Sequence, residues 1–246
     1  MAAVDLDLIP GFANLRDVAG YRVGSSTVRA HALLRSDAPT ALDDDAAAAL
    51  RAVGLAQVLD LRDEREQAMA PSAFAARGFA VTHLPIFEPS AHALVQPEVG
   101  LTELYRHMVE DCAHTLTGAV RAVARGPVDG AVLVHCTAGK DRTGLTVALA
   151  LRAVGVSRAD VVANYAQTEA RLRGPWLDAQ LVRLAAFLGA ERAHAFVDVL
   201  VGSPVAAIEA ALDAVEDGSS ERTRPYLRAH GMTDAELRSL EVRLLG

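Results

Sequence analysis

Cysteine is scarce in this chain, which has two, Cys112 and Cys136, among its 246 residues. Two thiols do not make the disulfide framework of a small secreted domain, and no spacing of cysteine and histidine predicts a metal site. We therefore expect neither a metal nor another cofactor. A reducing cytoplasm is the expected compartment, while export by a route that needs no signal peptide stays open.

Long apolar runs and a positively charged start are also missing. The first residues, MAAVDLDLIPGF, are acidic where a signal peptide carries positive charge. No stretch of about 18 apolar residues occurs, so no membrane span is expected. The formal net charge of −7 argues against general binding to nucleic acid or to an anionic membrane. An anionic ligand would have to be held by a local cluster of positive groups.

Apolar residues are plentiful, at 51%, which is enough for one substantial core, in one domain with an insertion or in two domains. Strand and helix patterns alternate along the first two thirds of the chain. The run GAVLVHC at 130–136 is typical of a central parallel strand. We also expect strands at 28–36, 56–62 and 79–86 and helices at 43–54, 100–125, 143–154 and 157–172.

The last third of the chain has helical patterns only. Residues 175–202 are apolar, show no strand-like alternation, and have Gly-Pro or Gly-Ser-Pro at both ends. Amphipathic helices are expected at 203–217 and 233–245. The predicted architecture is α/β, with a parallel-rich central sheet flanked by helices and an inserted helical hairpin near 173–203. The hairpin is either a lid over a site or a helix pair in the core.

The segment after the central strand, HCTAGKDRTG, places a thiol, a lysine and an arginine in one tight turn before a helix. In an open parallel sheet, ligands bind at the carboxyl ends of the strands. Small residues at 137–139 let the backbone amides turn inward as an anion-binding nest, aided by the helix N-terminus. Arg142 could return to this nest and donate two hydrogen bonds to one phosphate. The same features favour the thiolate form of Cys136.

Three other interpretations of this loop fit less well. A lone cysteine at a strand end is usually a packed apolar side chain, which we prefer for Cys112, whereas Gly139 and Arg142 accompany Cys136. A nucleotide-binding P-loop would need glycine where Val134 stands, and serine or threonine in place of Asp141. A redox C-x-x-C site would need a second cysteine at position 139.

HCTAGKDRTG resembles the His-Cys-x5-Arg-Ser/Thr signature of the cysteine-dependent protein tyrosine phosphatases. NLRDVAGY (14–21), LLRSDAP (33–39), VLDLRDERE (58–66) and the lysine-aspartate pair in the loop are similar to the bacterial tyrosine/serine phosphatases, a group with a mycobacterial member. The resemblance runs from about residue 8 to the C-terminus and is weakest across 88–100 and 173–203. We expect one phosphatase domain over 1–246, with the apolar segment 173–203 as its helical lid insertion.

The resemblance implies three catalytic residues. Cys136 would be the nucleophile that forms a phosphocysteine, and Arg142 the cation that stabilises charge on the phosphoryl oxygens. The chain lacks a Trp-Pro-Asp loop, since its one tryptophan, Trp176, follows the signature, and the narrower group points to Asp141 as the acid. Asp141 could instead cap the helix, in which case the next candidates are Asp111, Glu88 and Asp178.

Further residues are implied in binding the substrate or in supporting the loop. The implied substrate-binding set is Thr137, Ala138, Gly139, Lys140, Thr143 and Arg62. Lys140 is either a phosphoinositide contact or a surface lysine, and Asp60 could hold Arg62 toward the pocket. Structural or supporting roles are expected for Arg16 paired with Asp17, and for Arg35, His135, Asn164 and Tyr165.

The expected activity is metal-independent hydrolysis of phosphotyrosine, with phosphoserine, phosphothreonine and phosphoinositides as further substrates and inorganic phosphate as the product. A phosphatase of small metabolites or lipid headgroups is the alternative within the same chemistry. A catalytically silent phosphate-binding module is an alternative of another class, disfavoured because both Cys136 and Arg142 are present. A sulfurtransferase also cradles a cysteine, but the phosphate-binding signature does not suit it.

Overall fold

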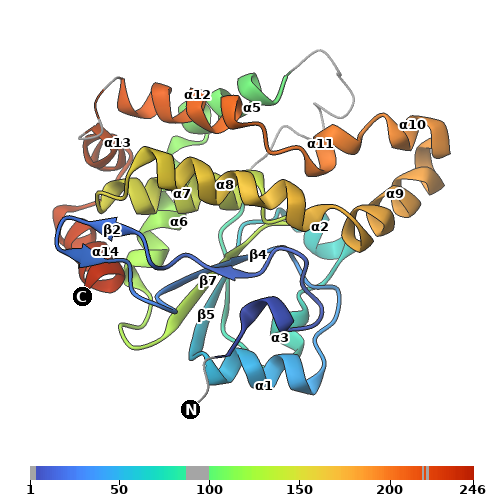
Figure 1. The fold of residues 1–246 in the computed structure, drawn as a ribbon, viewed down its shortest axis with the longest axis horizontal. Coiled ribbons are helices and arrows are strands. Elements are labelled where there is room, and N and C mark those ends of the chain that lie inside the picture. The colour runs from blue at the N-terminus through green and yellow to red at the C-terminus, as the bar shows by residue number, and fades with distance from the viewer. Residues whose placement is uncertain (1–3, 87–99, 218, 220–221) are drawn as a thin grey trace.

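A five-stranded sheet forms the centre of the molecule (Figure 1). The computed structural model describes residues 4–86, 100–217, 219 and 222–246. In order across the sheet, the strands are β1 (Arg16–Asp17), β4 (Leu33–Ser36), β7 (Ala131–His135), β5 (Leu55–Asp60) and β6 (Val81–His83). The last four run parallel to one another, and β1 is antiparallel to β4. The prediction of an α/β fold with a parallel-rich sheet is confirmed.

The central strand β7 is buried along its whole length. Side chains alternate between the two faces of a strand, so Val132 and Val134 belong to one core cluster and Ala131 and Leu133 to another. A strand buried on both faces appears in the sequence as a continuous apolar run, which is why this strand could be predicted with nearly correct bounds.

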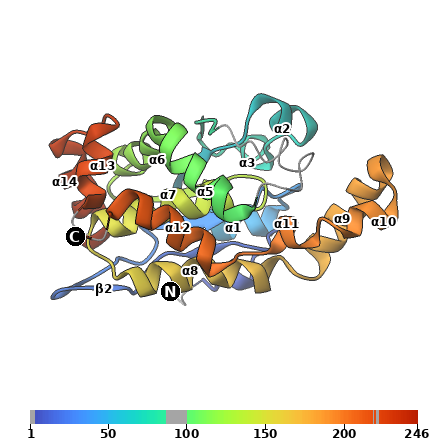
Figure 2. The same ribbon diagram turned by 90° about the horizontal axis from the view of Figure 1, so that it is seen from above.

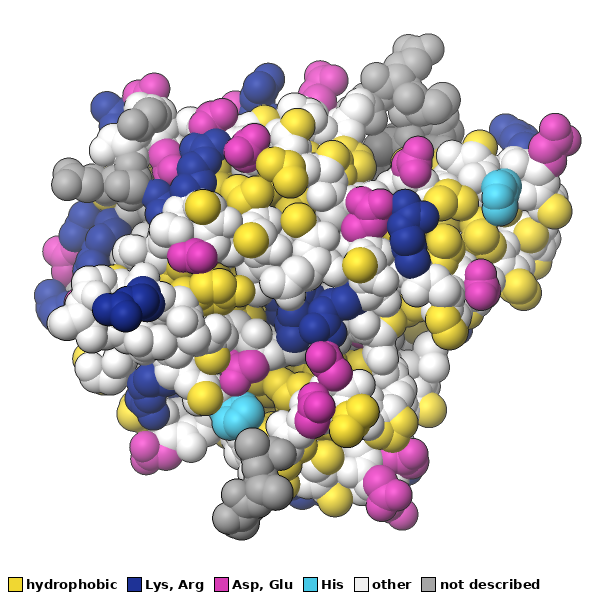
Figure 3. Space-filling model, viewed as in Figure 1, with side chains coloured by type: hydrophobic (Ala, Val, Ile, Leu, Met, Phe, Trp, Pro, Cys, Tyr) yellow, Lys and Arg dark blue, Asp and Glu magenta, His cyan; other side chains and the backbone are white. Residues whose placement is uncertain are grey.

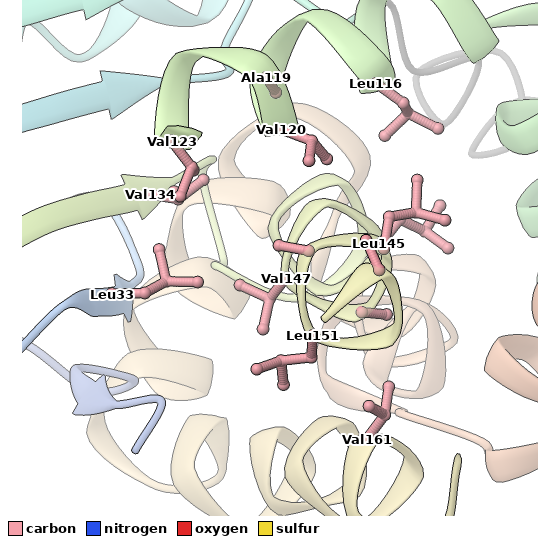
Figure 4. Close-up of a cluster of buried hydrophobic side chains, with 14 of the residues drawn as sticks. Leu33, Leu116, Ala119, Val120, Val123, Val134, Leu145, Val147, Leu151 and Val161 are labelled. Carbon is pink, nitrogen blue, oxygen red and sulfur yellow. The ribbon is translucent and has the colours of Figure 1, made fainter. Parts of the chain in front are cut away.

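Helices cover both faces of the sheet (Figures 1 and 2). The larger core cluster joins one face to α5 (Leu101–Asp111), α6 (Ala113–Arg125), α7 (Asp141–Ala153), α8 (Arg158–Leu172), α12 (Val205–Glu216), α13 (Thr223–Ala229) and α14 (Asp234–Leu245). Figure 4 shows part of it, where Val134 of β7 lies beside Val123 of α6. The other face packs against the 3-10 helix η1 (Leu6–Leu8), α1 (Asp44–Ala52) and α3 (Ala73–Ala76).

The predicted strand at 28–36 is shorter in the structure, where β4 begins at Leu33. His31 has a positive φ of 58°, a conformation that interrupts an extended chain. Its backbone N–H donates to Asp17 Oδ2 at 2.8 Å. Residues before this bend form a separate hairpin of β2 (Arg22–Val23) and β3 (Ser26–Thr27).

Two predicted helical segments are divided. The segment 100–125 is two helices, α5 and α6, which meet at Cys112. The segment 175–202 is three helices, α9 (Pro175–Leu188), α10 (Ala190–His194) and α11 (Val197–Val201), rather than a two-helix hairpin. Gly189, with φ 82°, separates α9 from α10, because glycine adopts positive φ without steric cost. A short helix absent from the prediction, α2 (Glu64–Met69), follows β5.

The helices α9 to α11 form an arm at one end of the molecule, with α9 and α10 extending from the body in both views (Figures 1 and 2). Hydrophobic side chains are exposed on this arm (Figure 3), including Val182 at 73% and Phe187 at 86% exposure. Within the described residues, no helix is both long enough and apolar enough to span a membrane.

Candidate active site

The loop between β7 and α7 lies at the carboxyl end of the central strand. β7 ends at His135, and Cys136 is 2% exposed. The chain turns at Gly139, whose φ is 64°. A Cβ at this glycine would lie 2.1 Å from the backbone oxygen of Ser36, at the end of β4. Only glycine therefore permits this close approach of the loop to the neighbouring strand.

Helix α7 begins at Asp141, so Asp141 and Arg142 stand in its first turn. The predicted start, residue 143, was two residues too late. The N-terminal N–H groups of a helix lack intrahelical acceptors and favour an anion. Cys136 thus lies in the loop that leads into a positive helix end, which is a suitable place for a thiolate and a phosphate.

Arg142 is 3% exposed and forms a two-point ion pair with Glu66 of α2. Its Nη1 donates to Glu66 Oε2 at 2.6 Å and its Nη2 to Oε1 at 2.7 Å. Thr137 also donates its hydroxyl to Glu66 Oε1 at 2.5 Å. Burial alone would raise the pKa of Glu66, but the bonds and charge of Arg142, with Thr137, lower it to about 2.

The end of β5 carries a second buried ion pair. Arg62 donates through Nε to Asp60 Oδ1 at 2.9 Å and through Nη2 to Oδ2 at 2.7 Å. Its Nη1 donates to the Ala70 carbonyl at 2.7 Å. Asp60 thus fixes the guanidinium of Arg62, and Arg62 in turn holds the C-terminal end of α2 at Ala70. The role of Arg62 in substrate binding stays a prediction.

His135 is fully buried beside Asp60, with 3.8 Å between His135 Nε2 and Asp60 Oδ2. Its Nδ1 lies 3.0 Å from the Cys136 carbonyl oxygen and therefore acts as the N–H donor. Burial, only partly opposed by Asp60, lowers the pKa of His135 to about 4. A neutral imidazole therefore holds the backbone of Cys136 at neutral pH.

Asp141 lies in a chain of buried polar groups. The Tyr105 hydroxyl of α5 donates to Asp141 Oδ1 at 2.6 Å, and the Tyr165 hydroxyl of α8 lies 2.7 Å from that of Tyr105. Burial and then the charge of Asp141 raise the pKa of Tyr105, so this hydroxyl stays protonated as a donor. Lys140 Nζ lies 3.4 Å from the same Asp141 oxygen.

Lys140 is not a surface lysine, since it is 1% exposed. Its ammonium group donates to the carbonyl of Val199, in α11, at 2.6 Å. Trp176, Leu177 and Leu200 of the arm belong to a small apolar cluster that also contains Ala138 of the loop. The arm is therefore in direct contact with the loop, through one hydrogen bond and one apolar cluster.

A layer of buried polar side chains supports the loop from below. Asn14 donates to the carbonyl oxygens of Ala138 and Gly139 at 2.9 and 3.1 Å. Arg35 donates to the Gly139 carbonyl at 2.7 Å and to Asn164 Oδ1 at 2.8 Å. Arg16 and Asp17 do not pair with each other, because consecutive side chains of a strand point to opposite faces. Arg16 donates to Asn14 and Asn164 instead, and Asp17 contacts His31.

The remaining candidates are dispersed. Thr143 is fully buried in α7, and no hydrogen-bond partner of its hydroxyl is found among the described residues. Asp111 pairs with His107 on the exposed side of α5 at 2.5 Å, and Asp178 is exposed on α9. Glu88 lies outside the described residues. Of these carboxylates, only Asp141 is shown in the loop itself.

Sequence reasoning missed Glu66 and Tyr105. The pattern Asp63-x-x-Glu66 is a capping-box signature and could have located α2, where both capping bonds are present. Nothing in the sequence pairs Glu66 with Arg142, which lies 76 positions away. Tyr105 stands in an amphipathic helix, where an aromatic residue indicates only a core position. Within the described part of the chain, no cluster of metal-binding side chains occurs.

Comparison with known proteins identifies the family. A model of the tyrosine phosphatase family matches residues 8–246. The chain is 33% identical over 187 residues to the triple specificity protein phosphatase PtpB of Mycobacterium tuberculosis, covering 64% of this chain and 67% of that protein. It is 29% identical over 218 residues to a provisionally named tyrosine-protein phosphatase of Cupriavidus necator, covering 84% and 77%.

A tyrosine-protein phosphatase of Nostoc commune is 36% identical over 116 residues, which cover 47% of this chain and 40% of that protein. A solved structure of a provisionally named phosphatase from Neisseria meningitidis aligns with a TM-score of 0.36 and 14% identity, covering 63% of this chain and 91% of that one. The family match spans almost the whole chain and includes the loop from Cys136 to Arg142. The chain belongs to the tyrosine phosphatase family, and it is a protein tyrosine phosphatase.

Proposed function

We propose that this phosphatase hydrolyses phosphotyrosine, phosphoserine, phosphothreonine and phosphoinositides through a phosphocysteine intermediate on Cys136. The observation that carries the proposal is the arrangement of Cys136 and Arg142 on one short loop. Cys136 directly follows the central strand, and Arg142 stands in the first turn of the following helix with its guanidinium held by Glu66. This arrangement supports a mechanism in which a thiolate and a planar cation act on one bound phosphate.

In the first step, the thiolate of Cys136 attacks phosphorus, an S–P bond forms, and the bond from phosphorus to the leaving oxygen breaks. Arg142 and the amides of Thr137, Ala138 and Gly139 stabilise the charge on the phosphoryl oxygens. Asp141 gives its proton to the leaving oxygen. Tyr105 and Lys140 both contact Oδ1 of Asp141, so Oδ2 is the oxygen that would deliver this proton.

In the second step, water attacks phosphorus and the S–P bond breaks, which releases inorganic phosphate and restores the thiolate. Asp141, ionised after the first step, takes a proton from the attacking water. Thr143 donates its hydroxyl to the departing sulfur. Thr143 is buried two positions after Asp141, and the described residues offer no other partner for its hydroxyl, which supports this role.

Two observations support the proposed range of substrates, namely the name of one relative and the presence of Lys140 in the loop. The Mycobacterium tuberculosis relative is named a triple specificity phosphatase, and the proposal extends this breadth to the present chain. Lys140 would bind a further phosphate of an inositol lipid after exchanging the Val199 carbonyl for that phosphate. This exchange requires α11 to move, which makes residues 173–203 a lid in the proposed mechanism.

A trapping experiment tests the covalent step. The wild type, quenched in acid during turnover of a radiolabelled phosphopeptide in the presence of EDTA, should retain label on Cys136. Cys136→Ser should neither turn over nor retain label, yet should still bind inorganic phosphate. Turnover of Cys136→Ser near the wild-type rate would exclude the mechanism. A panel of phosphopeptides, phosphoinositides and small phosphate esters then decides the substrate class, and no turnover of any of them would indicate a silent binding module.

A further inference from the structure

Among the described residues, two arginines buried beside the loop between β7 and α7, here called the catalytic loop, have no carboxylate partner. Arg35 of β4 is 1% exposed and Arg16 of β1 is 5% exposed. The two stand opposite each other in the β1–β4 pair, and both lie within 3.5 Å of the Thr168 hydroxyl. Among the ion pairs of the described residues, none includes either arginine. Burying a guanidinium without a counter-ion is costly.

All other cations close to the loop have an acidic partner. From the end of β5, Arg62 pairs with Asp60, beside the neutral His135 of β7. From α2, Glu66 pairs with Arg142. Within the loop, Lys140 lies 3.4 Å from Asp141. Positive charge without a local partner is therefore concentrated at Arg35 and Arg16.

One further acid, Asp37, faces this region from the end of β4, and two tyrosines face it from α5 and α8. Asp37 accepts bonds from the backbone N–H groups of Ala13 and Asn14 at 3.0 and 2.8 Å. It makes no ion pair with either arginine. Burial, opposed by those backbone bonds, raises the pKa of Asp37 to about 6. Tyr105 and Tyr165 remain protonated, since burial raises the pKa of both.

Arg35 reaches the loop directly. Its Nη2 donates to the Gly139 carbonyl at 2.7 Å, in the middle of the segment that joins Cys136 to Arg142. Burial lowers the pKa of Arg35, and a negative charge on Cys136 is the largest effect that opposes this. A guanidinium stays protonated in proteins, so Arg35 keeps its positive charge in the fold. An anion in the loop therefore offsets part of the free-energy cost of burying that charge.

We propose that Arg35, with Arg16 behind it, is the buried counter-charge for the anion in the catalytic loop. That anion is first the thiolate of Cys136 and then the bound phosphate, so the inference rests on the proposed function. Arg35 acts through the loop and is a positioning residue. If Arg35 were purely structural, it would act only through its hydrogen bonds to Gly139 and Asn164, and its charge would not affect the anion in the loop.

Arg243 of α14 offers a matched control for these two roles. It is 2% exposed and donates to the carbonyl oxygens of Ala32, Gly130 and Pro127, with no acidic partner among the described residues. It contacts the chain just before β7, whereas Cys136 follows the other end. Gly130 and Cys136 are six positions apart along the extended chain, which at about 3.3 Å per residue separates the two sites by roughly 20 Å.

The test measures anion binding and thiolate formation, neither of which needs turnover. Binding of inorganic phosphate is measured by calorimetry in a Cys136→Ser background. The thiolate of Cys136 is measured by its ultraviolet absorbance in a Cys112→Ala background. Arg35→Gln should weaken phosphate binding about tenfold. At mildly acidic pH it should also reduce the fraction of Cys136 present as thiolate about tenfold. Both losses are of the size expected when one nearby opposite charge is removed. Arg35→Lys should restore most of both signals, and Arg243→Gln should change neither.

A second variant covers the case in which Arg35→Gln does not fold. Asn164→Asp places a carboxylate where the Asn164 oxygen now accepts from Arg35, and so neutralises the charge while keeping the side chain. It should lower both signals in the same way. Wild-type phosphate affinity and thiolate fraction in a folded Arg35→Gln or Asn164→Asp protein would overturn the proposal. Failure of the proposed function would appear instead as turnover by Cys136→Ser.

Discussion

Glu66 and Arg142 face each other through two hydrogen bonds of 2.6 and 2.7 Å, and this pair connects α2 to the first turn of α7. Glu66 also closes the capping box of α2 by accepting from the backbone N–H of Asp63 at 2.9 Å. One carboxylate therefore fixes both the start of a short helix and the plane of the guanidinium. A rotated guanidinium could not bind two phosphoryl oxygens at once.

Glu66→Gln should lower kcat/KM on the order of tenfold to a hundredfold, because an amide offers one acceptor where the carboxylate offers two. Steady-state kinetics on a phosphopeptide checks this. The matched control is Asp63→Ala, which removes the helix cap without touching Arg142 and should cost about 1 kcal/mol of stability with little change in kcat. Equal kinetic losses in both variants would show that α2 matters only for folding.

Asp141→Asn should slow hydrolysis of alkyl phosphates much more than that of activated aryl phosphates. A good leaving group departs without a proton, whereas a positioned acid raises the rate for a poor leaving group about 10²–10⁴-fold. The fall in rate on the alkaline side of the pH profile should also flatten. The measurement is kcat/KM against leaving-group pKa for both enzymes.

Tyr105→Phe is the companion variant, since it removes the hydroxyl bond to Asp141 and keeps the ring in the core. It should alter the alkaline limb without removing the dependence on leaving group. If Asp141→Asn loses the same factor on every leaving group and keeps its pH profile, Asp141 is not the acid. Asp111 and Asp178 are then the variants to make.

Removing residues 175–202 and joining the ends with a short glycine linker should speed oxidation of Cys136 by peroxide. The arm contacts the loop at Ala138 and Lys140, and a thiolate is oxidised faster when solvent reaches it. Inactivation rates with and without inorganic phosphate provide the readout. A deletion variant that fails to fold, as judged by circular dichroism, would favour the alternative of a core helix pair.

Acid should destabilise the fold in two windows of pH. The pKa of His135 is about 4 in the fold against the ordinary 6.5, so the unfolded chain takes up the proton first and stability is lost as pH falls from 6.5 to 4. This loss is on the order of 3 kcal/mol. The pKa of Glu66 is about 2 in the fold against the ordinary 4.5. The unfolded chain again takes up the proton first, so stability is also lost as pH falls from 4.5 to 2.

Thermal unfolding from neutral pH down to about pH 3 separates the two groups. His135→Asn, whose amide can still donate to the Cys136 carbonyl, should lose the upper component of the pH dependence. Glu66→Gln should lose the lower component. Identical pH dependence in wild type and His135→Asn would mean that His135 does not govern the upper window.

The features predicted well from the sequence are those carried by consecutive residues. The run before Cys136 indicated a strand buried on both faces, and the small residues that follow it indicated a tight turn into a helix. By contrast, α2 has no buried residue, so it shows no apolar periodicity. The break between α5 and α6 at Cys112 contains neither glycine nor proline. The two helices separate because α5 packs on α12 whereas α6 packs on α7 and α14. The sequence does not show these different packing partners.

The supporting contacts of the loop could not be predicted because they join distant positions. Arg35 contacts Gly139 across 104 positions, and Asn14 contacts it across 125. Polar residues in strand-end motifs indicated structural importance, but not which carbonyl each would meet. The burial of Lys140 depends on α11 lying over it, which a solvent-exposed loop pattern does not reveal.

Lys140 is the only lysine in the sequence, and its ammonium group is buried against Val199. Amine-reactive labels should therefore modify the folded protein at its amino terminus alone. A lysine-specific protease has a single cleavage site, in the loop between β7 and α7, so it can divide the chain into two fragments only when that loop becomes accessible. The rate at which the whole chain is cleaved therefore measures how accessible this loop is to the protease.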